Sequence, residues 1–73
     1  MEQLKNMLQE RFPSIDFESE KNLMSDGILD SLAVVGIIAE IEDLFDVQVT
    51  MEYIQPAYFE SVETMWEMVE ELQ

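Results

Sequence analysis

The chain has 73 residues, of which 48% are hydrophobic, and its 17 acidic and 3 basic residues give a net charge of -14. This length predicts a single small domain, residues 1–73, with enough apolar material to fold. The charge opposes binding to nucleic acid and anionic membranes and favours partners with basic patches, whereas the absence of Cys and His excludes thiolate and imidazole chemistry.

The first predicted helix covers about residues 2–12, since apolar residues recur every three or four positions until Pro13 ends the pattern. Residues 14–29 lack such periodicity but include many apolar residues, so we expect a long loop that packs against the core. Gly27 predicts a turn at its end.

The second predicted helix starts near Ser31 and carries an apolar stripe wider than that of an ordinary amphipathic helix. The stripe comprises Val34, Ile37, Ile38, Ile41, Leu44 and Phe45, widened by Leu32, Val35 and Ala39. Such a helix is either mostly buried or has a second apolar use. The acidic residues Glu40, Glu42 and Asp43 lie in its later turns, where the helix dipole disfavours carboxylates, so we predict that they contact partners.

Further along the chain, residues 47–49 are predicted to be extended, and Thr50 to cap a brief helix, residues 51–54, that Pro56 interrupts or restarts. The last helix is predicted to start after a Ser61 cap. Its apolar face comprises Val62, Met65, Trp66, Val69 and Leu72, and its outward side Glu63, Glu67, Glu70 and Glu71. Three long helices, a short third helix and a long first loop predict an all-α fold, a small four-helix bundle.

Ser31 is the candidate functional residue, in the run Asp30-Ser31-Leu32. No His or Cys is present to activate a serine, so hydrolase chemistry is excluded. An external enzyme could instead esterify Ser31 with a phosphate-bearing group, which the backbone N–H groups and dipole of a first helical turn would stabilise. The other interpretation is that Asp30 or Ser31 simply caps the helix, and the tripeptide alone favours it.

Four groups of residues extend this local motif: Asp26-Gly27-Ile28-Leu29-Asp30-Ser31-Leu32; then Val35, Ile38, Ile41, Glu42 and Phe45; then Val47-Gln48-Val49; and finally Phe59-Glu60-Ser61-Val62. In these residues, and over essentially its whole length, the chain resembles the acyl carrier protein family. The resemblance implies a protein that is not itself an enzyme. In this family a phosphopantetheinyl transferase, using coenzyme A and magnesium, attaches 4′-phosphopantetheine to the serine that matches Ser31. The thiol of the arm then holds acyl or aminoacyl groups as thioesters.

The resemblance also implies partners and contacts. An adenylate-forming ligase or acyltransferase would charge the thiol, and a downstream acyl-accepting enzyme would take the cargo. Asp30 would engage the transferase and its metal, Leu32 would be an apolar contact, and Gly36 would lie in the contacted part of the second helix.

The pathway stays open between three alternatives. Ala33 and Gly36 stand where many carriers of fatty acid biosynthesis have acidic residues, so recognition by those enzymes is in doubt. The Gly and His that precede the serine in peptidyl carriers are Leu29 and Asp30 here. The run from Gly27 to Leu32 is closer to that of D-alanyl carrier proteins, and stand-alone carriers of specialised pathways share these traits.

The remaining features suggest no further site. The six methionines, among them Met24, Met51, Met65 and Met68, could line an adaptable acyl pocket, although core filling is favoured. Phe45 and Trp66 are predicted to be core, and the carboxylate clusters fit no calcium loop, so no metal site is predicted.

We expect a cytoplasmic monomer without membrane insertion, because no secretory signal or spanning apolar run is visible. The rival functional hypothesis is an acidic helical interaction module, such as a nucleic-acid mimic, that needs no modification.

Overall fold

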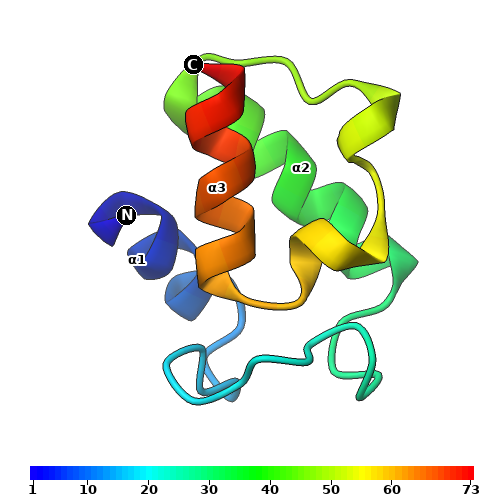
Figure 1. The fold of residues 1–73 in the computed structure, drawn as a ribbon. Coiled ribbons are helices and arrows are strands. Elements are labelled where there is room, and N and C mark those ends of the chain that lie inside the picture. Colours follow the sequence, from blue (N-terminus) through cyan, green and yellow to red (C-terminus); the bar gives the residue numbers. More distant parts are fainter.

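The computed structural model describes residues 1–73 and is all-helical without strands, as predicted. Its α-helices are α1 (Glu2–Arg11), α2 (Ser31–Phe45) and α3 (Val62–Leu72) (Figure 1). Two short 3-10 helices, η1 (Met51–Tyr53) and η2 (Pro56–Phe59), lie between α2 and α3. None of the helices is long and apolar enough to cross a membrane.

The segment predicted to form the short third helix is the main difference from expectation. It forms 3-10 helices and no α-helix: η1 lies at the predicted position, and η2 starts at Pro56. Pro56 has no N–H to continue a helix, and its ring forces Gln55 into an extended conformation, with φ -136° and ψ 146°. Thr50 precedes η1 as predicted, but its side chain makes no capping hydrogen bond. The structure therefore contains three α-helices, and the four-helix bundle is not confirmed.

The long loop between α1 and α2 packs against the core, as predicted. It runs along one end of the helices, at the lower edge of Figure 1. Phe17, Leu23 and Leu29 from this loop are almost fully buried. Gly27 has a φ of 71°, in the left-handed region that glycine adopts readily, which confirms the predicted turn.

The core is one continuous cluster to which the three α-helices, η2 and the connecting segments contribute. Its fully buried members are Leu4 and Leu8 of α1, Leu23 of the loop, Ile37 and Ile41 of α2, Phe59 of η2, and Met65, Met68 and Val69 of α3. Helix α1 contacts both other helices, and η2 packs against α3. Phe45 and Trp66 pack against this cluster in an edge-to-face pair, with ring centroids 5.7 Å apart.

Helix α3 begins at the predicted cap. The Ser61 hydroxyl oxygen accepts a hydrogen bond from the Thr64 backbone N–H at 3.2 Å, and the Thr64 hydroxyl oxygen accepts one from the Ser61 N–H at 3.1 Å. Met68 is fully buried although it falls outside the predicted apolar face. The reciprocal cap fixes where η2 ends and α3 starts.

Helix α2 is only half buried, so the first of the two alternatives for its wide apolar stripe is wrong. Val34, Ile37 and Ile41 face the core, whereas Leu32 is 83% exposed and Val35 63% exposed. The helix ends at Asp46, which has a φ of 53° in the left-handed region. An apolar strip of α2 therefore faces outward next to Ser31.

Candidate functional site

Asp30 and Ser31 have separate roles at the start of α2. The Asp30 carboxylate accepts a hydrogen bond from the Ala33 N–H at 2.8 Å, and its carbonyl oxygen accepts one from the Val34 N–H at 3.0 Å. Asp30 is thus the N-cap, as one of the two interpretations predicted. Ser31 is the first helical residue, and its exposed hydroxyl makes no hydrogen bond within the protein.

Ser31 differs structurally from most of the other serines. The hydroxyls of Ser19 and Ser25 donate hydrogen bonds to carboxylates, and Ser61 is buried as the α3 cap. Ser14 is exposed and unbonded like Ser31, but it lies in the turn after α1 and not at a helix start. Among these serines, Ser31 alone combines a free hydroxyl with the first turn of a helix.

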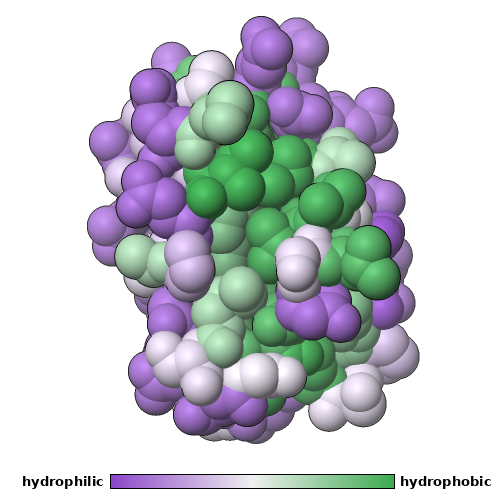
Figure 2. Space-filling model, turned by 90° about the vertical axis from the view of Figure 1, so that its right-hand side faces the viewer, coloured by the Kyte–Doolittle hydropathy of each residue, from purple (hydrophilic) through white to green (hydrophobic).

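A groove of about 190 Å³ opens beside the Ser31 side chain, between α2 and the η2 segment. Its lining is mostly apolar and consists of Met24, Ser31, Val34, Val35, Ile54, Gln55, Pro56 and Phe59. Figure 2 shows hydrophobic side chains gathered across the centre of one face, with hydrophilic residues around them. Leu32 and Val35 near the start of α2, Met51 in η1 and Ile54 just after η1 are large hydrophobic residues that are exposed. Met24 is the methionine that lines the groove, whereas Met65 and Met68 fill the core.

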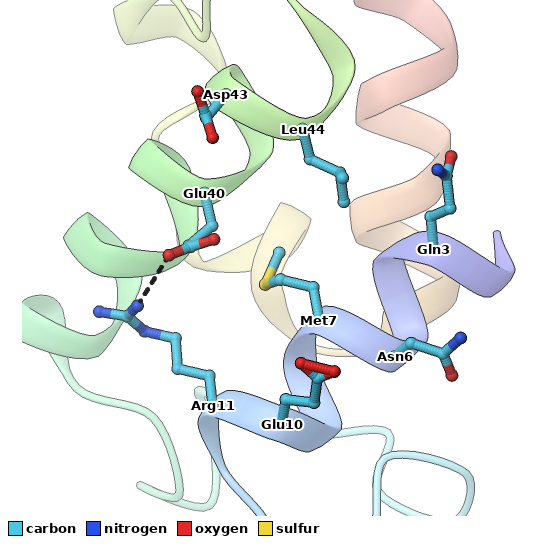
Figure 3. Close-up of a pocket in the computed structure, with 8 residues that line it drawn as sticks. All are labelled: Gln3, Asn6, Met7, Glu10, Arg11, Glu40, Asp43 and Leu44. Carbon is cyan, nitrogen blue, oxygen red and sulfur yellow. Dashed lines mark hydrogen bonds and ion pairs between the residues drawn. The ribbon is translucent and has the colours of Figure 1, made fainter.

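Two predicted partner contacts, Gly36 and Glu40, lie together under the side chain of Arg11. The guanidinium of Arg11 lies over Gly36, and its Nη1 is 3.3 Å from Oε1 of Glu40. Figure 3 shows this ion pair at one edge of a second cavity, between α1 and α2. That cavity measures about 520 Å³ and is lined by Gln3, Asn6, Met7, Glu10, Arg11, Glu40, Asp43 and Leu44. Neither Ser31 nor Asp30 contributes to it.

The other acidic residues of α2 differ in role. Glu42 is half buried, and its carboxylate accepts a hydrogen bond from the Val49 backbone N–H at 2.9 Å. This contact ties α2 to the segment before η1, so Glu42 has a structural role that the sequence analysis did not anticipate. Asp43 is exposed and its carboxylate makes no hydrogen bond or ion pair within the protein, so it stays available to a partner.

Glu60 is the site residue whose role sequence reasoning missed. Its carboxylate accepts hydrogen bonds from the Met24 N–H at 2.8 Å, the Ser25 N–H at 2.9 Å and the Ser25 hydroxyl at 2.5 Å. Its backbone carbonyl accepts one from the Leu23 N–H at 2.9 Å. Glu60 thereby fixes the loop residue Met24, one wall of the groove. No local pattern signals this contact, because the bonded groups are far apart in the sequence.

The hydrogen bonds from Ser25 and Met24 lower the pKa of the Glu60 carboxyl. The ionised group therefore stabilises the fold at pH values above the ordinary carboxyl range, and this contribution is lost as the pH falls through the lowered folded-state pKa. We expect Glu60→Gln to be less stable than wild type at neutral pH, with the difference shrinking on acidification. Urea unfolding at a series of pH values measures this, with Glu67→Gln, exposed on α3, as the matched control. A difference in the free energy of unfolding that stays constant as the pH becomes acidic would contradict a stabilising role for the Glu60 charge.

The cap at Asp30 gives a second stability prediction. Asp30→Ala removes the acceptor of the Ala33 N–H and should lower the free energy of unfolding by about 1 kcal/mol. Asp30→Asn keeps a side-chain oxygen in the same place and should fold about as stably as wild type. Denaturant unfolding followed by circular dichroism compares the two variants, and equal losses in both would show that the cap is not what stabilises this end of α2.

The Ser31 hydroxyl makes no hydrogen bond to a group that could act as a general base. No His or Cys exists to deprotonate Ser31, and the neighbouring Asp30 carboxylate is engaged by the Ala33 N–H. The backbone N–H groups of Ser31 and Leu32 make no hydrogen bond within the protein and remain available to an anion. No family model, curated protein or solved structure matches the chain.

Proposed function

We propose that this protein is an acyl or aminoacyl carrier whose Ser31 bears a 4′-phosphopantetheine arm, added from coenzyme A by a phosphopantetheinyl transferase. The observation that carries the proposal is the free Ser31 hydroxyl in the first turn of α2, beside an apolar groove. The sequence resemblance to acyl carrier proteins supports the same residue. When attached, the arm supplies a thiol that holds acyl groups as thioesters.

The residues around Ser31 fit such an arm. A phosphodiester there would meet the free N–H groups of Ser31 and Leu32 and the positive end of the α2 dipole. Val35 and Ile54 provide apolar walls for the arm or its cargo. At about 190 Å³ the groove is smaller than the roughly 300–1,000 Å³ of typical ligand pockets, so it suits a short cargo. A short cargo favours D-alanylation or a specialised pathway over long-chain fatty acid synthesis.

We also propose that the architecture is a variant of the four-helix carrier fold. In it, η1 and η2 together take the place of the short third helix. They follow α2, precede the capped α3 and supply Ile54, Pro56 and Phe59 to the groove.

The partners are those that the resemblance to acyl carrier proteins implies, and the surface charge suits them. An adenylate-forming ligase or acyltransferase and a downstream acyl-accepting enzyme must each reach the same arm in turn. The net charge of -14 and exposed groups such as Asp43 and Asp46 would attract basic partners and speed short encounters, with strong dependence on salt. Transient partners of this kind are consistent with a carrier and not with a permanent complex.

Coexpression with a broad-specificity phosphopantetheinyl transferase, followed by intact-mass measurement, tests the proposal. We expect the addition of one phosphopantetheine arm per chain, dependent on coenzyme A and magnesium. A chain that gains no mass would overturn the carrier function and favour the rival, an acidic interaction module that functions unmodified.

A further inference from the structure

Glu60 joins two segments that flank the groove beside Ser31. Three consecutive backbone N–H groups of the long loop, those of Leu23, Met24 and Ser25, all donate to this one residue. The Leu23 N–H bonds to the Glu60 carbonyl oxygen, whereas the other two bond to its carboxylate, which also accepts the Ser25 hydroxyl. Glu60 thus holds the loop backbone at the point where Met24 lines the groove.

The three walls of the groove are held in different ways. The α2 wall belongs to a regular helix, and the η2 wall is anchored by Phe59, which is fully buried in the core. Met24 lies in no helix and is only half buried. Apart from the burial of its neighbour Leu23, the hydrogen bonds to Glu60 tie its backbone to another element. The Met24 wall is therefore the one that moves if the Glu60 carboxylate is lost.

The chemistry of the groove suits the acyl end of a cargo carried on Ser31. None of its eight lining residues is charged, although charged residues make up 27% of the chain and line both other cavities. Ser31 itself lines the groove, so a group attached to its hydroxyl begins there. A tethered group has a high effective concentration at a neighbouring site, which favours an arm folded back with its acyl chain in the groove.

We propose that the Glu60 carboxylate determines how long an acyl chain this carrier shelters, because it holds the groove narrow. This inference rests on the proposed carrier function. A water-sized group takes about 30 Å³ of liquid, so a groove of about 190 Å³ holds about six such groups, roughly one butyryl thioester. A longer chain has to displace Met24, and the hydrogen bonds to Glu60 oppose that movement.

The test uses the full chain carrying arms that already bear an acyl group. The broad-specificity transferase installs them on Ser31 from butyryl- or dodecanoyl-coenzyme A, and intact mass confirms loading. Cargo that occupies the groove stabilises the folded state, so the Tm of each acyl form is compared with that of the form with a free thiol. We expect butyryl to raise the Tm of wild type and dodecanoyl to add nothing further.

Glu60→Ala should remove this limit on chain length. In this variant dodecanoyl should raise Tm by at least about 4 °C more than butyryl does, because a wider groove buries more methylenes. Glu60→Gln should keep part of the limit, since its amide oxygen still accepts from the loop N–H groups. Ser25→Ala removes only the hydroxyl donor and should give a smaller change in the same direction.

Further variants and a second measurement separate chain selection from stability. Met24→Ala shortens the wall itself and should admit dodecanoyl with Glu60 in place. Glu67→Gln, exposed on α3, should match wild type. Hydroxylamine should cleave the dodecanoyl thioester several-fold more slowly in Glu60→Ala than in wild type. A variant that merely loses stability would expose its cargo and be cleaved faster.

Three results would decide against the proposals. An equal response to chain length in wild type, Glu60→Ala and Met24→Ala would overturn the inference while leaving the carrier function intact. If Glu60→Ala does not fold, unchanged chain selection in both Glu60→Gln and Ser25→Ala would overturn it in the same way. Failure of wild type to load any arm at Ser31 would instead overturn the carrier function.

Discussion

Ser31→Ala is expected to abolish arm addition completely while leaving the fold unchanged. The hydroxyl is the proposed point of attachment, and it makes no hydrogen bond that the fold needs. The cap of α2 is Asp30, which the substitution leaves in place, and alanine is a favourable residue in a first helical turn. Intact-mass measurement after coexpression with the transferase gives the result directly.

Ser14→Ala is the matched control for this prediction. Ser14 is also exposed and its hydroxyl is also unbonded, but it lies in the turn after α1, outside the groove. We expect full loading of this variant. Arm addition to Ser31→Ala, or its loss in Ser14→Ala, would show that the modified residue is not Ser31. Thermal unfolding of both variants should coincide with that of wild type.

Phe59→Ala is expected to cause the largest loss of stability, about 3–5 kcal/mol. Phe59 is fully buried in η2, packs in the core and lines the groove beside Ser31. Because small domains have free energies of unfolding near the lower end of about 5–15 kcal/mol, this change removes most of the stability. Urea unfolding followed by circular dichroism measures the loss.

Ile54→Ala separates the groove from the core. Ile54 lines the same groove but is 48% exposed, so its truncation should cost less than about 1 kcal/mol. Comparable losses for Ile54→Ala and Phe59→Ala would contradict the view that burial of Phe59 in the core anchors η2. A folded Ile54→Ala protein also allows the groove to be tested with loaded cargo.

Local signals in the sequence predicted most of the helical structure. Pro13 ended the first helix within one residue of the predicted position, Gly27 marked its turn, and Ser61 capped α3. Each signal acts on its own neighbours through a missing N–H, a permitted φ or a short hydrogen bond, so consecutive residues suffice to predict it. For the short third helix the break at Pro56 was predicted, but its 3-10 form and the second turn, in which Phe59 is buried, were not.

The features of the candidate site likewise fall into two groups, those that the sequence determines and those that only the tertiary structure determines. The sequence by itself determined that the protein is helical and acidic, that it lacks His and Cys, and that Ser31 follows a carboxylate able to cap a helix. Only the tertiary structure decided that the Ser31 hydroxyl is free, that an apolar groove lies beside it, that Glu42 and Glu60 hold distant backbone, and that Arg11 covers Gly36. These are contacts between segments far apart in the chain, and they depend on how the helices pack, which no stretch of neighbouring residues specifies.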